Sequence, residues 1–391
     1  MPGPAHAAAH PDAPWTLFFP TDPAVVDAAI ATGLDPEVDE WLVTLTARKA
    51  MLPALADALV RRGSESGKQL RRAMRPVLSW QLRTRDLPLH LPHIMGIVNL
   101  TEDSFSGDGV GRDVRAALRQ ADSLRRAGAA IIDVGGETAR ADRPVMEAAT
   151  EARFIAPVVE ALTCEGHIVS IDTYKPIVAR AALDSGAESV NDISGLTIGT
   201  GAAEEAARAG AGYVLNYSYS APKRRPDAPP VYRDVVEETV AWMFERVAAL
   251  HEIGLVDPQI AIDPGIAFGK SHDEDMQVLR RLGELRTLGL AILLAHSRKN
   301  FIGSVGGRVP AERDLETHVA SALAYGQGAR IFRVHDAEGA RRALEMASAL
   351  TTEEPGGFRP DGESWPWRAG ASAAHMTRSE PDKEAPKGQR W

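Results

Sequence analysis

The chain has 391 residues, of which 44% are hydrophobic, and its formal net charge is -9. This size allows one large core, such as a barrel of about 250 residues, with further segments around it. The acidic balance argues against a nucleic-acid partner, and a single cysteine, Cys164, excludes intramolecular disulfides and thiolate zinc sites.

The first residues, MPGPAHAAAHPDAP, lack the basic segment and apolar core of a secretory signal. No run of eighteen apolar residues occurs, so we expect no membrane span, no membrane partner and a cytoplasmic protein. Residues 1–14 are rich in Ala, Pro and His and are predicted to be disordered.

Residues 15–90 are predicted to form a helical N-terminal extension, whose role the sequence does not reveal. Residues 37–63 and 67–85 have helical spacing, and eight basic residues and one acid fall between Arg61 and Arg85. This basic run fits either an anion or partner surface or a solvated helix face. We favour the solvated face, because runs of charge usually face water.

Residues 91–350 alternate short Ile- and Val-rich strands with amphipathic helices, which is typical of a parallel sheet covered on both faces. The eight strand candidates are HIMGIVNL, AAIIDVG, HIVSIDT, SVNDISG, GYVLNYS, QIAIDPG, AILLAHS and RIFRVHD. Eight such units in this length predict an α/β fold of the (β/α)₈ TIM barrel type, and a doubly wound open sheet is the weaker alternative. Residues 351–391 are rich in Pro, Gly and charge, and we predict a disordered tail.

Each predicted strand ends at a polar residue, and the carboxyl ends of parallel strands open onto one mouth. Asn99 ends the first strand and offers a neutral oxygen suited to Mg²⁺ beside a substrate phosphate; it could equally cap the loop. Arg140, after the Gly-Gly turn of the second unit, suits a bidentate hold on phosphate or carboxylate.

Three further strand ends are Asp172, Asn191 and Asp263. Carboxylate and amide oxygens accept hydrogen bonds from ring N–H and amino groups, so the trio favours an NH-rich heterocycle. A metal cluster is the competing interpretation. We prefer the heterocycle, because no histidine lies at these ends to complete a transition-metal site.

The last two strands end in cationic residues, SRK at 297–299 and RVH at 333–335. The loops after strands seven and eight commonly bind phosphate in this fold, so these segments predict an anion pocket. Arg333 and His335 are two residues apart and share one face of their strand. Phe268 and Lys270 follow strand six in DPGIAFGK.

Together these motifs resemble those of the dihydropteroate synthase family. The resemblance covers residues 93–350 and rests on MGIVNLTEDSF, DVGGETAR, SIDTYKPIVARAAL, ESVNDISG, DPGIAFGK, SRKNFIG and RVHD, in the family's order and spacing. It implies a cytoplasmic, homodimeric transferase that joins 6-hydroxymethyl-7,8-dihydropterin diphosphate to 4-aminobenzoate with Mg²⁺, giving 7,8-dihydropteroate and diphosphate. The other pterin-binding barrels, corrinoid-linked folate-dependent methyltransferases, share the fold but are not characterised by the FGK and SRK segments.

The resemblance also implies a role for each matching residue. Arg140, Lys299 and Asp108 would be catalytic, and Asn99 would ligate Mg²⁺. The pterin would be bound by Asp172, Asn191, Asp263, Lys299 and Arg333, and Asn216 lies at the position of a further pterin contact. The diphosphate would be bound by Arg140, Arg333 and His335. The arylamine would be bound by Phe105, Phe268 and Ser297.

The sequence departs from the family pattern in the loops after strands one and two, where Glu102, Ala139 and Ala141 replace Pro, a hydroxyl residue and Pro. Asn216 replaces an apolar pterin contact, and Ala295 replaces a glycine. Two alternatives to an ordinary synthase therefore stay open: a pterin-binding paralogue that lacks synthase activity, and an enzyme that uses a different acceptor amine.

Overall fold

The computed structural model describes residues 15–351, apart from Trp41, 102–108, Val110, 139–142 and 225–229. The two segments predicted to be disordered lie outside the described residues, except for Thr351, which ends the last helix. No described helix is both long enough and apolar enough to cross a lipid bilayer.

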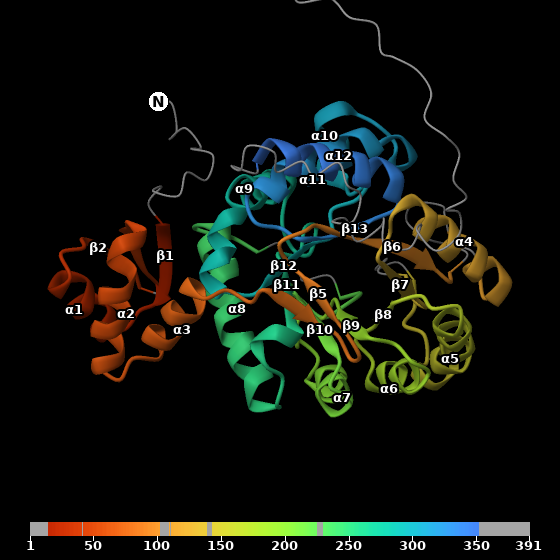
Figure 1. The fold of residues 1–391 in the computed structure, drawn as a ribbon, viewed down its shortest axis with the longest axis horizontal. Coiled ribbons are helices and arrows are strands. Elements are labelled where there is room, and N and C mark those ends of the chain that lie inside the picture. Colours follow the sequence, from red (N-terminus) through yellow and green to blue (C-terminus); the bar gives the residue numbers. More distant parts are fainter. Residues whose placement is uncertain are drawn as a thin grey trace, which may run out of the picture.

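Eight parallel strands close into a barrel: each pairs with the next one in the chain, and the last, β13, pairs with the first, β6 (Figure 1). They are β6 (His93–Asn99), β7 (Ile131–Gly135), β8 (Val169–Asp172), β9 (Ser189–Asp192), β10 (Gly212–Asn216), β11 (Ile260–Asp263), β12 (Ala291–Leu294) and β13 (Ile331–Val334). All eight predicted strands are present, and the (β/α)₈ prediction is confirmed.

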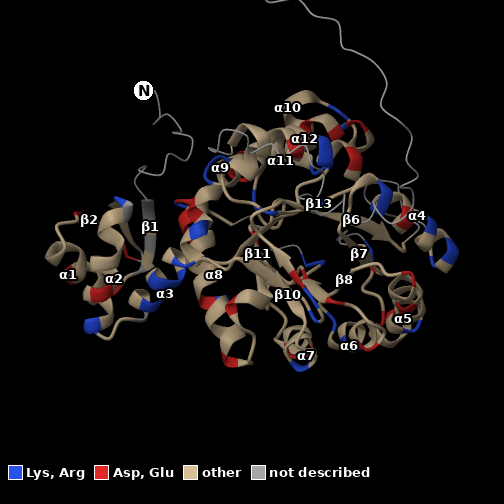
Figure 2. Ribbon diagram, viewed as in Figure 1, with Lys and Arg blue, Asp and Glu red and all other residues tan. Residues whose placement is uncertain are grey.

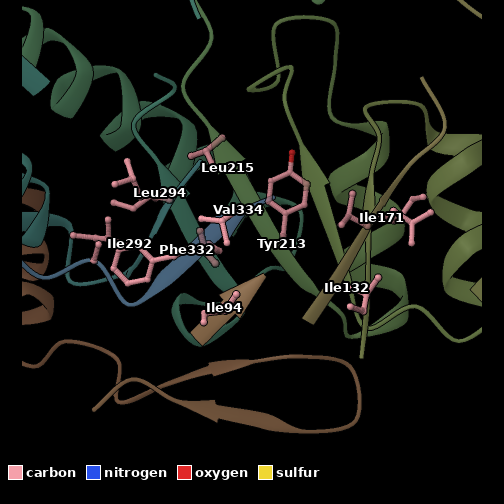
Figure 3. Packing of buried hydrophobic residues seen from close by; sticks show 14 of the residues in the cluster. Ile94, Ile132, Ile171, Tyr213, Leu215, Ile292, Leu294, Phe332 and Val334 are labelled. Atoms are coloured by element: carbon pink, nitrogen blue, oxygen red, sulfur yellow. The ribbon is translucent and has the colours of Figure 1, made fainter. Parts of the chain in front are cut away.

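Helices surround the barrel, and the outward side chains of the strands pack beneath them (Figure 3). The helices are α4 (Val114–Ala127), α5 (Ala148–Cys164), α6 (Pro176–Asp184), α7 (Gly201–Ala209), α8 (Val235–Glu252), α9 (His272–Arg280), α10 (Asn300–Gly306), α11 (Asp314–Gly326) and α12 (Ala337–Thr351), with 3₁₀ turns η2 (Asp257–Gln259), η3 (Leu282–Leu288) and η4 (Pro310–Glu312). In α4 the apolar stripe buries Ala117, Ala121 and Leu124, because residues three and four apart share one helix face.

The N-terminal extension is a small α/β unit and not an all-helical segment. Its elements are β1 (Trp15–Pro20), α1 (Pro23–Ala31), β2 (Pro36–Val38), β3 (Leu42–Ala47), η1 (Lys49–Met51), α2 (Leu52–Arg61) and α3 (Glu65–Met74), with the sheet order β1-β3-β2. The prediction of helix through LVTLTA was wrong: Val43 and Leu45 are buried while Thr46 is exposed, which is the period of two of a half-covered strand.

This unit has its own core, built around Leu17, Leu45, Leu55 and Leu59. It lies against the side of the barrel, where α3 packs on η3 and β1 packs on α8 (Figure 1). Two ion pairs cross the contact, Arg72 Nε to Asp257 Oδ2 at 3.0 Å and Arg233 Nη1 to Asp39 Oδ1 at 2.7 Å.

The basic run faces water and is partly neutralised, in line with the favoured interpretation. Figure 2 shows Lys and Arg positions along α3. Arg71 pairs with Asp57 at 2.7 Å, and Arg61 and Arg62 are exposed. Exposed pairs of this kind contribute little to stability, typically below about 1 kcal/mol.

A hairpin between the unit and the barrel, β4 (Ser79–Gln81) and β5 (Asp86–Pro88), closes the amino-terminal end of the barrel. Its Trp80 and Leu82 are buried against inward-facing residues that include Val214 and Ala261. The Trp80 indole donates a hydrogen bond to the Gln259 carbonyl at 3.0 Å. The hairpin therefore belongs with the barrel, and the opposite, carboxyl-terminal end is the one available for a site.

Candidate active site at the carboxyl-terminal mouth

The alternation of side chains along the strands directs the polar strand ends into the barrel. In β10, Leu215 joins the outer core under the helices, while Val214 joins the inner cluster above the hairpin. Asn216 lies two residues beyond Val214 and therefore points inward. The same rule turns Asp263 inward in β11, because Ala261 is an inner residue and Ile262 an outer one.

Arg333 lies at the centre of this mouth and bridges two acidic side chains. Its Nε donates to Asp133 Oδ2 at 2.6 Å, and its Nη2 donates to Asp172 Oδ2 at 2.8 Å. Asn191 Nδ2 also donates to Asp133 Oδ2, at 3.0 Å. The structure thus brings the predicted residues Asp172, Asn191 and Arg333 into one hydrogen-bonded network.

Asp133 is the member of this network that the sequence reasoning missed. It lies in the middle of β7 and is fully buried, whereas the predicted polar residues lie at strand ends. An acid inside the apolar run IIDVG was the available signal, because such a group is rarely buried without a partner. Its Oδ1 has no hydrogen-bond partner among the described residues.

Burial raises the pKa of both predicted carboxylic acids, Asp172 and Asp263. Burial raises the pKa of Asp172 to about 7, even though Arg333 opposes the shift. Burial also raises the pKa of Asp263, against the charges of Lys299 and Arg333 and a hydrogen bond from the Gly265 N–H. Asp172 can therefore hold or release a proton close to neutral pH.

Lys299 follows β12, which pairs with β13, the strand that carries Arg333. Its Nζ donates to the Ile266 carbonyl at 2.7 Å and lies 4.8 Å from the centroid of the Phe268 ring. Burial lowers the pKa of Lys299 to about 8, although Asp263 favours the charged form. The predicted residues Lys299, Asp263 and Phe268 thus lie around one part of the pocket.

Ser297 contacts His335, so these two predicted residues act as a pair. The His335 backbone N–H donates to Ser297 Oγ at 3.2 Å, and Ser297 Oγ lies 2.8 Å from His335 Nδ1. Ser297 Oγ can donate to an unprotonated Nδ1 or accept from a protonated one. The contact joins the segments that follow β12 and β13.

Asn216 occupies the position next to Asp263 in the barrel. Its Nδ2 donates to the backbone carbonyls of Tyr217, at 2.8 Å, and Ile193, at 3.4 Å. Because both partners are carbonyl oxygens, which only accept hydrogen bonds, the side-chain atom that contacts them must be the amide nitrogen. The amide oxygen is therefore the group that Asn216 can offer to a ligand.

The predicted metal ligand Asn99 ends β6 beside Gly135 of β7. The Asn99 amide oxygen and the Asp172 side chain both lie close to Gly135, since a Cβ added at this glycine would be 3.5 Å from Asn99 Oδ1 and 3.7 Å from the Asp172 side chain. Within the described part of the chain, no cluster of three or more His, Cys, Asp or Glu residues could enclose a metal ion. A single amide oxygen fits Mg²⁺ only when substrate phosphates and water supply the other ligands.

Three predicted site residues, Phe105, Asp108 and Arg140, lie outside the described residues, as do the departures at Glu102, Ala139 and Ala141. Ala295 is described and packs partly buried on the inner cluster. The structure therefore describes the strand ends that form the floor of the pocket. The roles of Phe105, Asp108 and Arg140, in the loops after β6 and β7, stay predictions from the sequence.

The chain is similar to known proteins over the whole barrel. The family model described as "Pterin binding enzyme" matches residues 95–335. The dihydropteroate synthase of Escherichia coli (strain K12) is 36% identical over 264 residues, which are 67% of this chain and 93% of that protein.

Two solved structures extend this likeness to complexes. Dihydropteroate synthase from Thermus thermophilus in complex with 4-aminobenzoate is 36% identical with a TM-score of 0.62, covering 70% of this chain and 99% of that one. The Xanthomonas albilineans enzyme in complex with 7,8-dihydropteroate is 32% identical with a TM-score of 0.62, covering 71% of this chain and 100% of that one.

Proposed function

Because the chain belongs to the dihydropteroate synthase family, we propose that it condenses 6-hydroxymethyl-7,8-dihydropterin diphosphate with 4-aminobenzoate. The products are 7,8-dihydropteroate and diphosphate. The observation that carries the proposal is the network of Arg333 with Asp133 and Asp172, joined by Asn191, at the centre of the mouth. It presents acidic and amide groups to an NH-rich ring and a cation beside them.

Each side chain of the mouth then has a task in this reaction. Asp172, Asn191 and Asp263 accept hydrogen bonds from the pterin ring, while Lys299 donates to it. Arg333 and His335, with Arg140, hold the diphosphate and stabilise the negative charge that develops on it as the bond to the pterin methylene carbon breaks. Phe268 lies beside Lys299 and supplies an apolar wall for the arylamine.

We propose Mg²⁺ as the cofactor, held by Asn99 together with the substrate diphosphate. When bound, the metal neutralises part of the charge on the leaving group. Reaction in the cytoplasm stays a prediction from the sequence, which cell fractionation would test.

We expect the purified protein, given the pterin diphosphate, 4-aminobenzoate and Mg²⁺, to release diphosphate and form dihydropteroate in equal amounts. Chelation of the metal should reduce the rate by at least about 100-fold, because the leaving group loses its main counter-charge, and added Mg²⁺ should restore it. Coupled diphosphate detection and chromatography of the product measure both.

Other outcomes of this assay would favour the alternatives. Tight pterin binding without diphosphate release would indicate a paralogue that has lost the activity. Release only with another arylamine would indicate a different acceptor. Methyl transfer to a corrinoid partner would contradict the proposal outright.

We also propose that the active form is a homodimer joined through α11 and α12. Leu315, Val319 and Leu323 form a stripe along α11 with exposures of 69%, 53% and 66%, and Met346 and Leu350 on the adjacent α12 are 59% and 73% exposed. A contiguous apolar surface of this kind marks an interface. A second copy is the natural occupant, because a two-fold dimer pairs the same face with itself.

Light scattering should give about twice the chain mass, and Val319→Glu should shift it to the monomer, since a charge in an apolar interface loses its hydration. Ile30→Glu is the matched control, because Ile30 is 62% exposed on α1 of the N-terminal unit. A monomeric wild type, or a Val319→Glu protein that stays dimeric, would contradict this interface.

A further inference from the structure

A buried cluster of opposite charges lies beside the pocket, centred on Glu137 just after β7. Glu137 Oε1 accepts from Lys223 Nζ at 2.5 Å and from the Met146 N–H at 2.9 Å. Its Oε2 accepts from Lys175 Nζ at 2.6 Å and from the Tyr174 hydroxyl at 3.0 Å. One carboxylate therefore receives four donors, two of them ammonium groups.

The two lysines also bind the far end of the connection that Glu137 begins. Lys223 Nζ donates to the Pro144 carbonyl at 2.9 Å, and Lys175 Nζ donates to the Met146 carbonyl at 2.8 Å. The start and the end of the β7–α5 connection are thus tied to the same pair of cations. Arg140, the residue proposed to hold diphosphate, lies between these anchors in the sequence.

Lys223 is the member of the cluster that comes from a different wall of the mouth. It belongs to the loop after β10, and its side chain is only 5% exposed. With Glu137, Tyr174 and Asp172 it lines a small pocket. Its φ of 61° places a non-glycine residue in the left-handed region, a conformation that tends to be retained at functional sites.

Lys223 balances the two carboxylates of the cluster, Glu137 and Glu151, and also joins two loops of the mouth. Lys175 already lies between Glu137 and Glu151, at 2.6 Å from an oxygen of each. Burial would raise the pKa of Glu137, but the hydrogen bonds from Lys175 and Lys223 hold it below its usual value. Burying a second ammonium group costs free energy, and what it adds is a link from the β10 loop to both ends of the β7–α5 connection.

We propose that Lys223 is a positioning residue for diphosphate binding, which acts through Glu137 and the Pro144 carbonyl to fix the two ends of the β7–α5 connection. The inference rests on the proposed function. It predicts that Lys223 matters for the diphosphate ester and not for the pterin ring, whose floor residues lie on β7 to β11, on β13 and in the loop after β12.

The test compares Lys223→Met, Lys223→Arg and a control, Arg224→Met. Arg224 is the exposed neighbour of Lys223 in the same loop. Lys223→Met should raise the KM for the pterin diphosphate by about 10- to 100-fold, the size of a lost charge-assisted hydrogen bond. The Kd for 6-hydroxymethylpterin, which lacks the diphosphate, should change by less than about 2-fold, and Lys223→Arg should recover most of the loss.

A second variant shows whether Lys223 acts through Glu137. Glu137→Gln should raise the same KM, and adding Lys223→Met to it should cost much less than Lys223→Met costs alone. Unchanged ester affinity in Lys223→Met would overturn the inference, and so would an equal loss for ester and free pterin, which indicates general damage to the pocket. Failure of the proposed function appears instead as a wild type that releases no diphosphate, and the comparison of ester and pterin Kd values then still decides the role of Lys223.

Discussion

Arg333→Met should reduce kcat/KM by about 10²- to 10³-fold, the effect of removing one stabilising donor of the transition state. It should also lower the free energy of unfolding by about 3–5 kcal/mol, because breaking a buried ion pair leaves uncompensated charge. Arg333 bonds both Asp133 and Asp172, and without it these two carboxylates on the neighbouring strands β7 and β8 lose the cation between them. Steady-state kinetics and denaturant unfolding measure the two effects.

A double variant separates stability from catalysis. Asp133→Asn in the Arg333→Met background removes one of the stranded charges, so part of the unfolding free energy should return while kcat/KM stays low. Recovery of both together would mean that Arg333 only supports the fold. A single Arg333→Met variant of near-normal kcat/KM would remove Arg333 from the diphosphate site.

The barrel and most of its polar mouth were predictable from the sequence, because apolar runs of strand length mark where each strand ends. Asn191 and Asp263 end apolar runs of strand length, and one mouth must receive them. Asp133 was missed for the same reason: it lies within a run and not at its end. Its role depends on Arg333, which is distant in sequence and adjacent only after the barrel closes.

The N-terminal unit shows where local patterns are ambiguous. LVTLTA is short, and its apolar residues fit a helical stripe as well as a strand. This segment forms a strand because it pairs with Trp15–Pro20. The two segments are distant in the sequence, so no local pattern could predict their pairing. The Lys223 cluster is similar, because a lysine in a polar loop looks solvated until the fold places it against Glu137.

The pKa of Lys299 predicts how substrate binding responds to pH. Burial lowers it to about 8, and only the ammonium form can donate to the pterin while carrying a positive charge. The affinity for the pterin diphosphate should therefore weaken as the pH rises through about 8. Lys299→Met should bind at least about 10-fold more weakly at pH 7, since a hydrogen bond to a charged group contributes about 1.5–3 kcal/mol, and its affinity should lack this alkaline loss.

Stability must change in the opposite direction, and this separates loss of binding from unfolding. The folded pKa of Lys299 lies below the 10.5 of a free lysine, so the folded state binds fewer protons and its stability rises between about pH 8 and pH 10.5. Lys299→Arg is the matched control, because a guanidinium keeps its charge throughout this range. If the alkaline loss persists in Lys299→Arg, another group titrates in its place, and Lys270, whose pKa burial lowers to about 7, is the first to replace.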